Sequence, residues 1–155
     1  MPQAPIRILF VCHGNICRST MAEFVLKDMV ARRGLADRFH IESAATSTEE
    51  IGNPVHPGTV SMLRKHGIGG FEGKRARQLT RADYDAFDLM VGMDAANMRN
   101  MARMLGADPA GKVRKLLEFA GSSRDVVDPW YTGDFDTTYA DVLAGCEGLL
   151  AHLGM

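Results

Sequence analysis

A short apolar run near the N-terminus leads through a glycine-containing loop into a helical pattern. Residues 6–11 are β-branched, aromatic or leucine apart from one arginine, as in a strand buried on both faces of a parallel sheet. From Ser19 to Gly34 apolar residues recur at helical spacing, with Glu23 close to the start, as capping patterns favour. The sequence therefore predicts a strand, a loop over 12–18 and a helix, which together begin a βαβ unit.

The same alternation continues along the rest of the chain. Strands are predicted over 39–44 and 87–93 and, from a weaker pattern, over 113–119; helices are predicted over 59–66, over 94–105 with Asp94 as N-cap, and along the apolar stripe over 139–153. Alternating strands and helices indicate an α/β protein whose parallel sheet is covered on both faces. A chain of 155 residues that is 46% hydrophobic can bury one sizeable core, so we expect a single domain over 1–155.

Composition restricts the classes of partner. The net charge is −1, which favours neither nucleic acid nor a membrane surface, and no apolar run is long enough to cross a bilayer. Three cysteines are an odd number for a framework of disulfides and are typical of free thiols. We therefore expect a cytoplasmic protein without nucleic-acid partners or membrane insertion.

The loop over 12–18 lies where ligands bind in such folds, beyond the carboxyl end of a strand. Backbone N–H groups at a helix N-terminus attract anions, and Gly14 and Asn15 tolerate the backbone conformations that a tight loop requires. Arg18 adds a planar pair of donors that matches two oxygens of a tetrahedral oxyanion. These features predict a phosphate site.

Cys12 lies in the same positive field, so its pKa is expected to be depressed, with Ser19 or Thr20 donating a hydrogen bond to the thiolate. Attack by the sulfur on a bound phosphate would form a phosphocysteine, and the departing oxygen would need a proton. Asp128 is the candidate acid, held extended because Pro129 follows it.

Two aromatic residues, Trp130 and Tyr131, follow this candidate acid and could flank a flat substrate ring. Other notable side chains are predicted to be structural: Cys146 and the series Met98, Met101 and Met104 lie on apolar helix faces.

The chain resembles the low-molecular-weight protein tyrosine phosphatases. The resemblance rests on the segments VCHGNICRS, SAATSTEEIGNP, HGI, ARQLT, DLMVGMD and DPW, which span nearly the whole sequence. It implies a four-stranded parallel sheet with helices on both faces and a phosphate-binding loop between the first strand and the first helix. It also implies hydrolysis of phosphotyrosine in protein substrates without metal or other cofactor, with inorganic phosphate as product.

The resemblance further implies a role for each matched residue. Cys12 matches the nucleophile, Arg18 the phosphate-binding arginine and Asp128 the general acid and base. The remaining assignments are a phosphate-binding loop of His13, Gly14, Asn15, Ile16, Cys17 and Arg18, a supporting network of Asn15, Ser19 and Ser43, a substrate rim of His13, Glu50, Trp130 and Tyr131, and Cys17 as a redox partner of Cys12.

Three residues depart from the family pattern. His13 stands where relatives commonly have an apolar residue, and Thr20 where a helix-starting proline is frequent. Lys74 stands at a position that is histidine in some members, so the polar network near Ser43 is expected to be connected differently.

Alternative functions are weighed on the same residues. A thiol-linked arsenate reductase would share the loop but needs further reactive cysteines, and the only other one is Cys146. A non-catalytic phosphate-binding module would not need both Cys12 and Asp128. A zinc site at Cys12, His13 and Cys17 lacks a second ligand pair, and a nucleotide-binding loop would have Gly-Lys-Ser/Thr. We expect a monomer, with weak homodimerisation through the aromatic rim as a hypothesis.

Overall fold

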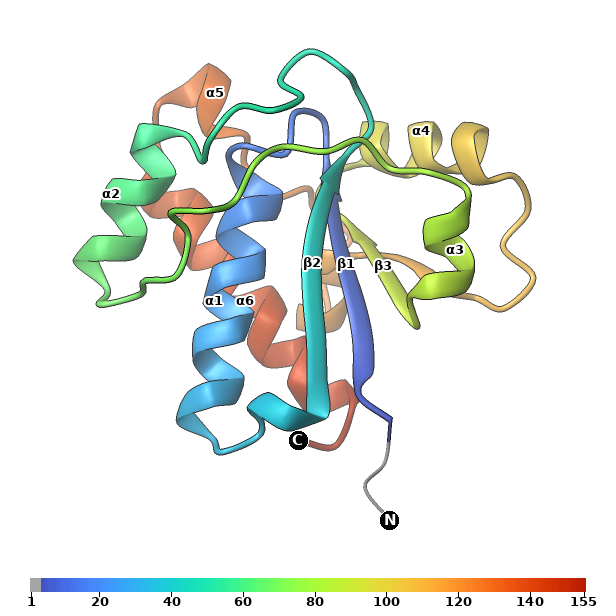
Figure 1. Ribbon diagram of the computed structural model, residues 1–155, viewed down its shortest axis with the longest axis horizontal. Coiled ribbons are helices and arrows are strands. Elements are labelled where there is room, and N and C mark those ends of the chain that lie inside the picture. Colours follow the sequence, from blue (N-terminus) through green and yellow to red (C-terminus); the bar gives the residue numbers. More distant parts are fainter. Residues whose placement is uncertain (1–3) are drawn as a thin grey trace.

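The computed structural model describes residues 4–155, and its four strands form one parallel sheet in the order β2-β1-β3-β4 (Figure 1). The strands are β1 (Ile6–Cys12), β2 (Phe39–Ala45), β3 (Leu89–Gly92) and β4 (Val113–Lys115). The predicted four-stranded parallel sheet is thus confirmed. Because β1 has a hydrogen-bonded neighbour on each side, its carboxyl end lies near the middle of the sheet edge.

Helices cover both faces of the sheet, as predicted. The helices are α1 (Arg18–Arg32), α2 (Pro57–Lys65), α3 (Ala82–Ala86), α4 (Ala95–Leu105), α5 (Pro129–Thr132) and α6 (Phe135–His152), with 3₁₀-helices η1 (Ala36–Arg38) and η2 (Leu116–Ala120). Figure 1 shows α1, α2 and α6 on one side of the sheet and α3 and α4 on the other.

The burial of β1 on both faces explains why most of its residues are apolar. Residues Ile8, Leu9, Phe10 and Val11 are completely buried. Ile8 and Phe10 pack into the core shared with α1 and α6, while Leu9 and Val11 pack into the core on the α4 side. Successive side chains of a strand point to opposite faces, so the middle of a strand between two helical layers is buried on both faces, and in β1 only Arg7, near its start, is exposed.

Several boundaries differ from those expected from the sequence. The third strand is shorter than 87–93, and α2 begins two residues before the expected start, with Pro57 in its first turn and His56 capping it through Gly58 N–H. The fourth strand was expected over 113–119 but ends at Lys115. There Glu118 accepts a hydrogen bond from the Lys115 N–H and turns the chain into η2, which packs on α6.

Two of the α-helices, α3 and α5, have no counterpart in the sequence expectations, and the start of a third differs from the expected one. Both α3 and α5 are a few residues long, too short for a periodic pattern. The C-terminal helix α6 begins at Phe135, ahead of the apolar stripe, because Asp134 caps it by accepting a hydrogen bond from Thr137 N–H. The methionine series and Cys146 lie in the cores, as predicted.

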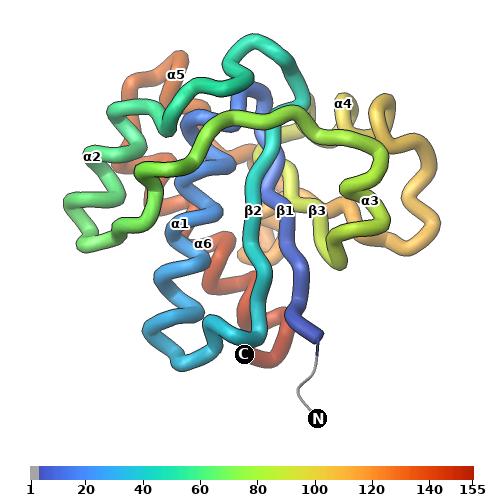
Figure 2. The backbone as a smooth tube through the Cα atoms, in the orientation of Figure 1, coloured from blue at the N-terminus to red at the C-terminus, as the bar shows by residue number. Residues whose placement is uncertain are grey.

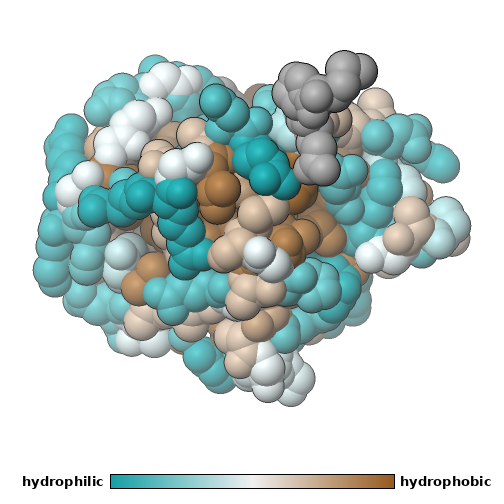
Figure 3. Space-filling model, turned by 90° about the horizontal axis from the view of Figure 1, so that it is seen from below, coloured by the Kyte–Doolittle hydropathy of each residue, from teal (hydrophilic) through white to brown (hydrophobic). Residues whose placement is uncertain are grey.

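Loops from distant parts of the chain meet at the carboxyl ends of the strands. Figure 2 traces the connection from α2 to α3, which crosses the carboxyl end of β2, where Ala45 pairs with Gln78. The opposite end of the molecule presents apolar side chains at the centre of its surface, surrounded by hydrophilic ones (Figure 3). Because the strands are parallel, the loops that follow β1, β2 and β3 gather at one end of the molecule.

Gly148 provides a test of the packing between α6 and η2. A Cβ at this position would lie 2.1 Å from the Phe119 carbonyl oxygen, which is backbone and cannot move aside cheaply. Gly148→Ala should therefore lower the free energy of unfolding by about 1–3 kcal/mol. Gly73, where a Cβ meets nothing within 4 Å, is the matched control. Urea unfolding of Gly73→Ala should stay within about 0.5 kcal/mol of the parent; equal midpoints for both variants would contradict this account.

Candidate active site

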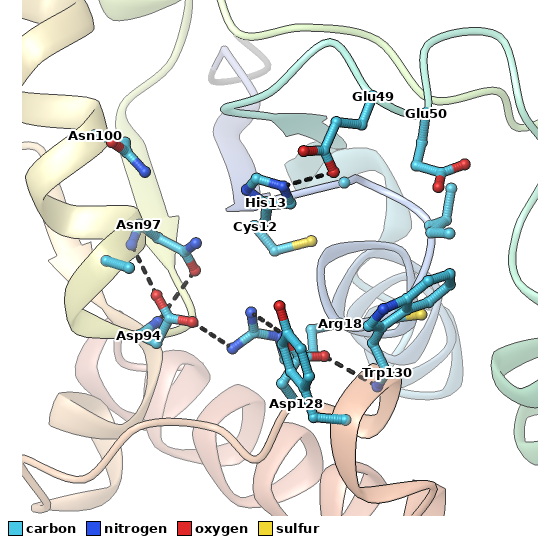
Figure 4. Close-up of a pocket in the computed structure, with 15 residues that line it drawn as sticks. Cys12, His13, Arg18, Glu49, Glu50, Asp94, Asn97, Asn100, Asp128 and Trp130 are labelled. Carbon is cyan, nitrogen blue, oxygen red and sulfur yellow. Dashed lines mark hydrogen bonds and ion pairs between the residues drawn. The ribbon is translucent and has the colours of Figure 1, made fainter.

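A pocket of about 450 Å³ opens where the carboxyl ends of the strands meet the loops (Figure 4). It is lined by Cys12, His13, Gly14, Ile16, Cys17, Arg18, Glu49, Glu50, Asp94, Ala96, Asn97, Asn100, Asp128, Trp130 and Tyr131. The structure thus brings together every residue expected to react with or border a phosphate, apart from Asn15. The expected network residues Asn15, Ser19 and Ser43 are completely buried behind the pocket.

The loop between β1 and α1 is shaped by its backbone. Among residues 4–155, Asn15 is the one non-glycine residue with a positive φ, +58°. The carbonyl oxygens of four loop residues accept hydrogen bonds from the flanking segments: Cys12 from Thr46, His13 from Ser47, Ile16 from His56, and Cys17 from Met21. Since N–H and C=O point in opposite directions across a peptide plane, the following N–H groups face the inside of the loop. Such a concave set of N–H groups binds anions.

The Cys12 sulfur has a defined hydrogen-bond partner. Its Sγ lies 3.0 Å from Ser19 Oγ, and Asn15 Nδ2 donates to the same Oγ at 2.8 Å. The orientation of the Asn15 amide is settled because its Oδ1 accepts from the Arg77 N–H at 3.2 Å. Ser19 Oγ therefore accepts a hydrogen bond from the amide and can donate its own hydrogen to the sulfur, which suits a thiolate.

The network continues from this amide to a buried ion pair. Asn15 Nδ2 also donates to Ser43 Oγ at 2.8 Å, and Ser43 Oγ in turn donates to Glu23 Oε1. Lys74 Nζ lies 3.3 Å from the same Oε1 and donates to the Ser43 carbonyl oxygen at 2.7 Å. Burial lowers the pKa of Lys74, an effect that the charge of Glu23 partly opposes. A chain of contacts thus links the Cys12 sulfur to a lysine on a distant segment.

Arg18 forms the floor of the pocket. Its side chain is 3% exposed; Nη1 donates to Asp94 Oδ2 at 2.8 Å and to the Val126 carbonyl at 3.1 Å, while Nη2 donates to Asp128 Oδ2 at 3.3 Å. Burial alone disfavours the charged guanidinium, but the negative charges of Cys12, Asp128 and Asp94 outweigh it and raise the pKa of Arg18. The guanidinium is therefore a permanent cation that contacts Asp94 and Asp128 in the pocket that Cys12 also lines.

Asp128 is placed by the segment that leads into α5. Its backbone is extended, with φ −90° and ψ 107°, as expected for a residue before proline, and its Oδ1 accepts from the Trp130 N–H at 3.1 Å. The carboxylate is 28% exposed, so it reaches both the pocket and solvent. The rings that follow are exposed, Trp130 by 59% and Tyr131 by 84%. Trp130 is braced by an edge contact with His56.

The mouth of the pocket is formed by the loop after β2. Glu49 Oε2 lies 2.9 Å from His13 Nε2, and both side chains are mostly exposed. Glu50 crosses Gly14 so closely that a Cβ there would lie 3.4 Å from Glu50 Cγ. Figure 4 shows both carboxylates on the same side of the pocket, with the Cys12 thiol pointing between them and Arg18.

The comparisons with known proteins agree with this geometry. The sequence profile described as low molecular weight phosphotyrosine protein phosphatase matches residues 7–155. The low molecular weight protein-tyrosine-phosphatase YfkJ of Bacillus subtilis is 42% identical over 150 residues, 96% of each chain. PtpA of Staphylococcus aureus, named likewise, is 36% identical over 149 residues, 96% of this chain and 94% of PtpA.

This chain belongs to the low molecular weight phosphotyrosine protein phosphatase family. Solved structures show the same fold: the crystal structure of YfkJ matches with a TM-score of 0.93 at 41% identity, covering 98% of this chain and 96% of YfkJ. The phosphatase SP-PTP from Streptococcus pyogenes matches with a TM-score of 0.86 at 42% identity, covering 96% and 93%. Cys12 and Arg18 occupy the phosphate loop of this family fold.

The departures from the family pattern have structural accounts. Thr20, expected as an alternative donor to Cys12, instead donates to the Cys17 carbonyl at 3.0 Å and so supports the first turn of α1. His13 binds Glu49 across the mouth, and Lys74 binds Glu23 and Ser43. The sequence led us to expect different connections around Ser43 because of Lys74, and this lysine does contact Ser43 and Glu23. Among residues 4–155, no three His, Cys, Asp or Glu side chains are grouped to hold a metal ion.

Sequence reasoning missed four contributors to the site. Asp94 was expected only as the cap of α4, which it is, but it also holds Arg18. Its position after β3 was the signal, since carboxyl ends of neighbouring strands converge. Glu23, Glu49 and Asn100 gave no local signal, because their roles depend on contacts between segments distant in sequence.

Cys17 lines the pocket, yet its thiol should be unreactive at neutral pH. Burial, reinforced by the nearby charges of Cys12 and Asp128, raises its pKa to about 12. At about pH 8.5, where half of a free cysteine is thiolate, the thiolate fraction of Cys17 is on the order of a thousandfold lower. In Cys12→Ser the charge of Cys12 is lost but burial, the largest cause, remains, so alkylation of Cys17 by iodoacetamide should still be at least about a hundredfold slower than that of free cysteine and should rise with pH. Mass spectrometry checks this, with the urea-unfolded protein as control. A rate within about tenfold of free cysteine would contradict the pKa argument.

Lys74 and Lys27 form a matched pair, since both bind the Glu23 carboxylate, at 3.3 Å and 2.6 Å. Lys74 is 13% exposed and Lys27 is 44% exposed. Lys74→Met removes a partly buried partner of the buried Glu23 and Ser43 and should lower the free energy of unfolding by about 1–3 kcal/mol. Lys27→Met should cost about 0–1 kcal/mol. Urea denaturation of both variants measures the two losses in the free energy of unfolding. A larger loss for Lys27→Met would show that the pair of Lys74 and Glu23 is not the more stabilising one.

Proposed function

We propose that this protein hydrolyses phosphotyrosine in protein substrates, and other aryl phosphates, through a phosphocysteine intermediate. One observation supports the proposal most directly: the Cys12 sulfur, the Arg18 guanidinium and the Asp128 carboxyl group all line one pocket. Ser19 is hydrogen-bonded to the sulfur. Family membership and the tyrosine phosphatases at 36–42% identity support it independently.

In the first step the substrate phosphate is held by the loop N–H groups and by Arg18, with Cys12 Sγ on the side opposite the leaving oxygen. The sulfur lone pair forms an S–P bond while the P–O bond to the aryl group breaks. Asp128, in its acid form, donates its proton to the departing phenolic oxygen. Its exposure toward the pocket and its anchorage at the start of α5 suit that position.

In the second step Asp128, now a carboxylate, takes a proton from a water molecule that attacks phosphorus. The O–P bond forms, the S–P bond breaks, and its electrons return to the Cys12 sulfur as thiolate. Ser19 stabilises that thiolate by its hydrogen bond, and inorganic phosphate is released. One carboxyl group therefore serves first as acid and then as base.

Charge on the transferring phosphoryl group is stabilised by groups already in place. Arg18 is oriented by Asp94 and by the Val126 carbonyl, so little reorganisation is needed when the phosphate oxygens develop charge. The loop geometry set by Asn15 directs the N–H groups to the same point. His13, Gly14, Ile16 and Cys17 contribute backbone rather than side-chain chemistry to phosphate binding.

An aryl group fits the mouth better than an alkyl group does. Trp130 and Tyr131 stand beside Asp128 as exposed rings against which a phenyl ring can pack. We propose a cytoplasmic monomer, consistent with three free thiols at Cys12, Cys17 and Cys146. Weak homodimerisation through the two rings remains a hypothesis. Among residues 4–155, no helix is long and apolar enough to span a membrane.

Cys17 is the proposed redox partner of Cys12. Both thiols line the pocket and both are free, so a sulfenic acid on Cys12 could condense with Cys17 to a disulfide with loss of water. The raised pKa of Cys17 makes this step slow at neutral pH and faster in alkali.

Two rival functions receive less support. Arsenate reduction would need a mobile resolving cysteine, but Cys146 is completely buried in the core, where burial also raises its pKa. A non-catalytic phosphate-binding module would have no use for an acid and a nucleophile facing the same pocket. Both Cys12 and Asp128 line this one.

Phosphate release from a phosphotyrosine peptide and from p-nitrophenyl phosphate tests the proposal. Cys12→Ser should lower kcat by on the order of 10³ or more with both substrates. Asp128→Ala should lower kcat by about 10²–10⁴ with phosphotyrosine but less with p-nitrophenyl phosphate, whose leaving group scarcely needs a proton.

The control for these variants is Asp136→Ala, an exposed carboxylate on α6 that should retain the parent rate. Addition of a chelator should leave the rate unchanged. If Asp128→Ala lowered kcat equally with both substrates, Asp128 would not be the general acid. If Cys12→Ser turned over at the parent rate, the reaction would not pass through a phosphocysteine.

A further inference from the structure

Negative charge surrounds the pocket to an extent that phosphate binding does not explain. Four carboxylates line it, from Glu49, Glu50, Asp94 and Asp128, and no lysine does. Its one permanent cation, Arg18, already pairs with Asp94 and Asp128 on the floor. The two glutamates at the mouth thus have no lysine or arginine partner among the residues that line the pocket.

Both mouth carboxylates are held in place rather than left to move freely. Glu49 is 69% exposed and its Oε2 lies 2.9 Å from His13 Nε2. Glu50 packs over Gly14, and its Oε2 accepts from Asn53 Nδ2 at 2.5 Å. Figure 4 shows the two side chains along the same upper border, above the Cys12 thiol. The negative charge of Glu50 also helps to raise the pKa of Cys17, after burial and the charges of Cys12 and Asp128, so its field reaches the loop.

Among the residues that line the pocket, the one carboxylate on the opposite border is that of Asp94, which is already paired with Arg18. There α4 presents Ala96 and Asn100, which are uncharged. His13 adds positive charge to the mouth only when its imidazole is protonated. The charge of the entrance is therefore set by the loop after β2.

These two glutamates disfavour the binding of an anionic substrate unless that substrate also carries positively charged side chains. A phosphotyrosine whose phosphate rests on Arg18 has its backbone at the mouth, so the neighbouring side chains of the peptide pass over the loop that bears Glu49 and Glu50. Acidic neighbours would add repulsion there, whereas a lysine or arginine would pair with a carboxylate already oriented toward it.

We propose that Glu49 and Glu50 select phosphotyrosine substrates that carry lysine or arginine beside the phosphorylated residue, and discriminate against substrates with acidic residues there. This inference rests on the phosphotyrosine phosphatase activity proposed above. Since the pairs are exposed, each is expected to contribute only a few-fold, and salt should weaken it.

Three phosphotyrosine peptides that differ only in the two flanking residues, Lys, Gln or Glu, test the proposal through kcat/KM for phosphate release. The parent should prefer the Lys peptide over the Glu peptide by about tenfold at low ionic strength, mainly through KM, and the preference should shrink in salt. In the Glu49→Gln/Glu50→Gln variant the two peptides should differ by about twofold or less. Gln preserves the hydrogen bonds to His13 and Asn53, so the loop should keep its shape.

Glu147→Gln is the matched control, because it makes the same charge change on an exposed part of α6 and should keep the parent preference. Titration of the same peptides into Cys12→Ser, followed by fluorescence of Trp130, measures the preference as binding alone. An unchanged preference in the double variant, or a parent that favours the Glu peptide, would overturn the inference.

The Gln peptide separates the two levels of the argument. If the parent hydrolyses it and treats all three peptides alike, only the role of Glu49 and Glu50 fails. If the parent releases no phosphate from the Gln peptide or from free phosphotyrosine, the phosphatase proposal fails and this inference fails with it.

Discussion

The hydrogen bonds of the buried Asn15 side chain hold the whole site together. Asn15 turns the loop through a left-handed backbone conformation. Its side-chain amide makes hydrogen bonds to Ser19, Ser43 and the Arg77 backbone at the same time. One side chain thereby connects the first helix, the second strand and the segment that crosses that strand. The concave N–H groups and the partner of the Cys12 sulfur both depend on this connection. The amide is completely buried, so each of its bonds is made in a medium where an unmade one is costly.

A buried polar network is stable only when its last member is also satisfied. Here the chain of donors and acceptors ends at Glu23, whose carboxylate is shared between the partly buried Lys74 and the more exposed Lys27. Burial lowers the pKa of Lys74, an effect that the charge of Glu23 partly opposes, and the hydrogen bond from Lys74 to the Ser43 carbonyl connects this side chain to β2. A residue that departs from the family pattern thus completes the network instead of breaking it. The arrangement of the loop depends on a charge pair remote from the sulfur.

Sequence reasoning succeeded where structure is determined locally and failed where it depends on tertiary contacts. The buried strand over 6–11, the loop over 12–18 and the first helix follow from composition and period. The end of β4 does not, because Leu116 and Leu117 pack against α6 in a 3₁₀-helix instead of extending the sheet. Likewise the loop motif predicts a cradle and Asp128 an acid, whereas the pairings of Glu23 with Lys74 and of Glu49 with His13 join residues far apart in the chain.

The two ends of the pocket are under different physical constraints. The floor must bring a sulfur, a guanidinium and a carboxyl group into one pocket, so it is built on a strand end, a helix start and the Asp-Pro turn, with Arg18 almost fully buried. The mouth only has to meet a substrate surface, and its glutamates belong to neither core cluster, although Val55 anchors the end of their loop in one of them. Substitutions at Glu49 or Glu50 can therefore alter the charge presented to a substrate while the network behind Asn15 stays intact. We therefore expect chemistry and the proposed selectivity to be separable, because the reacting groups and the two glutamates lie on different segments, one buried and one at the surface.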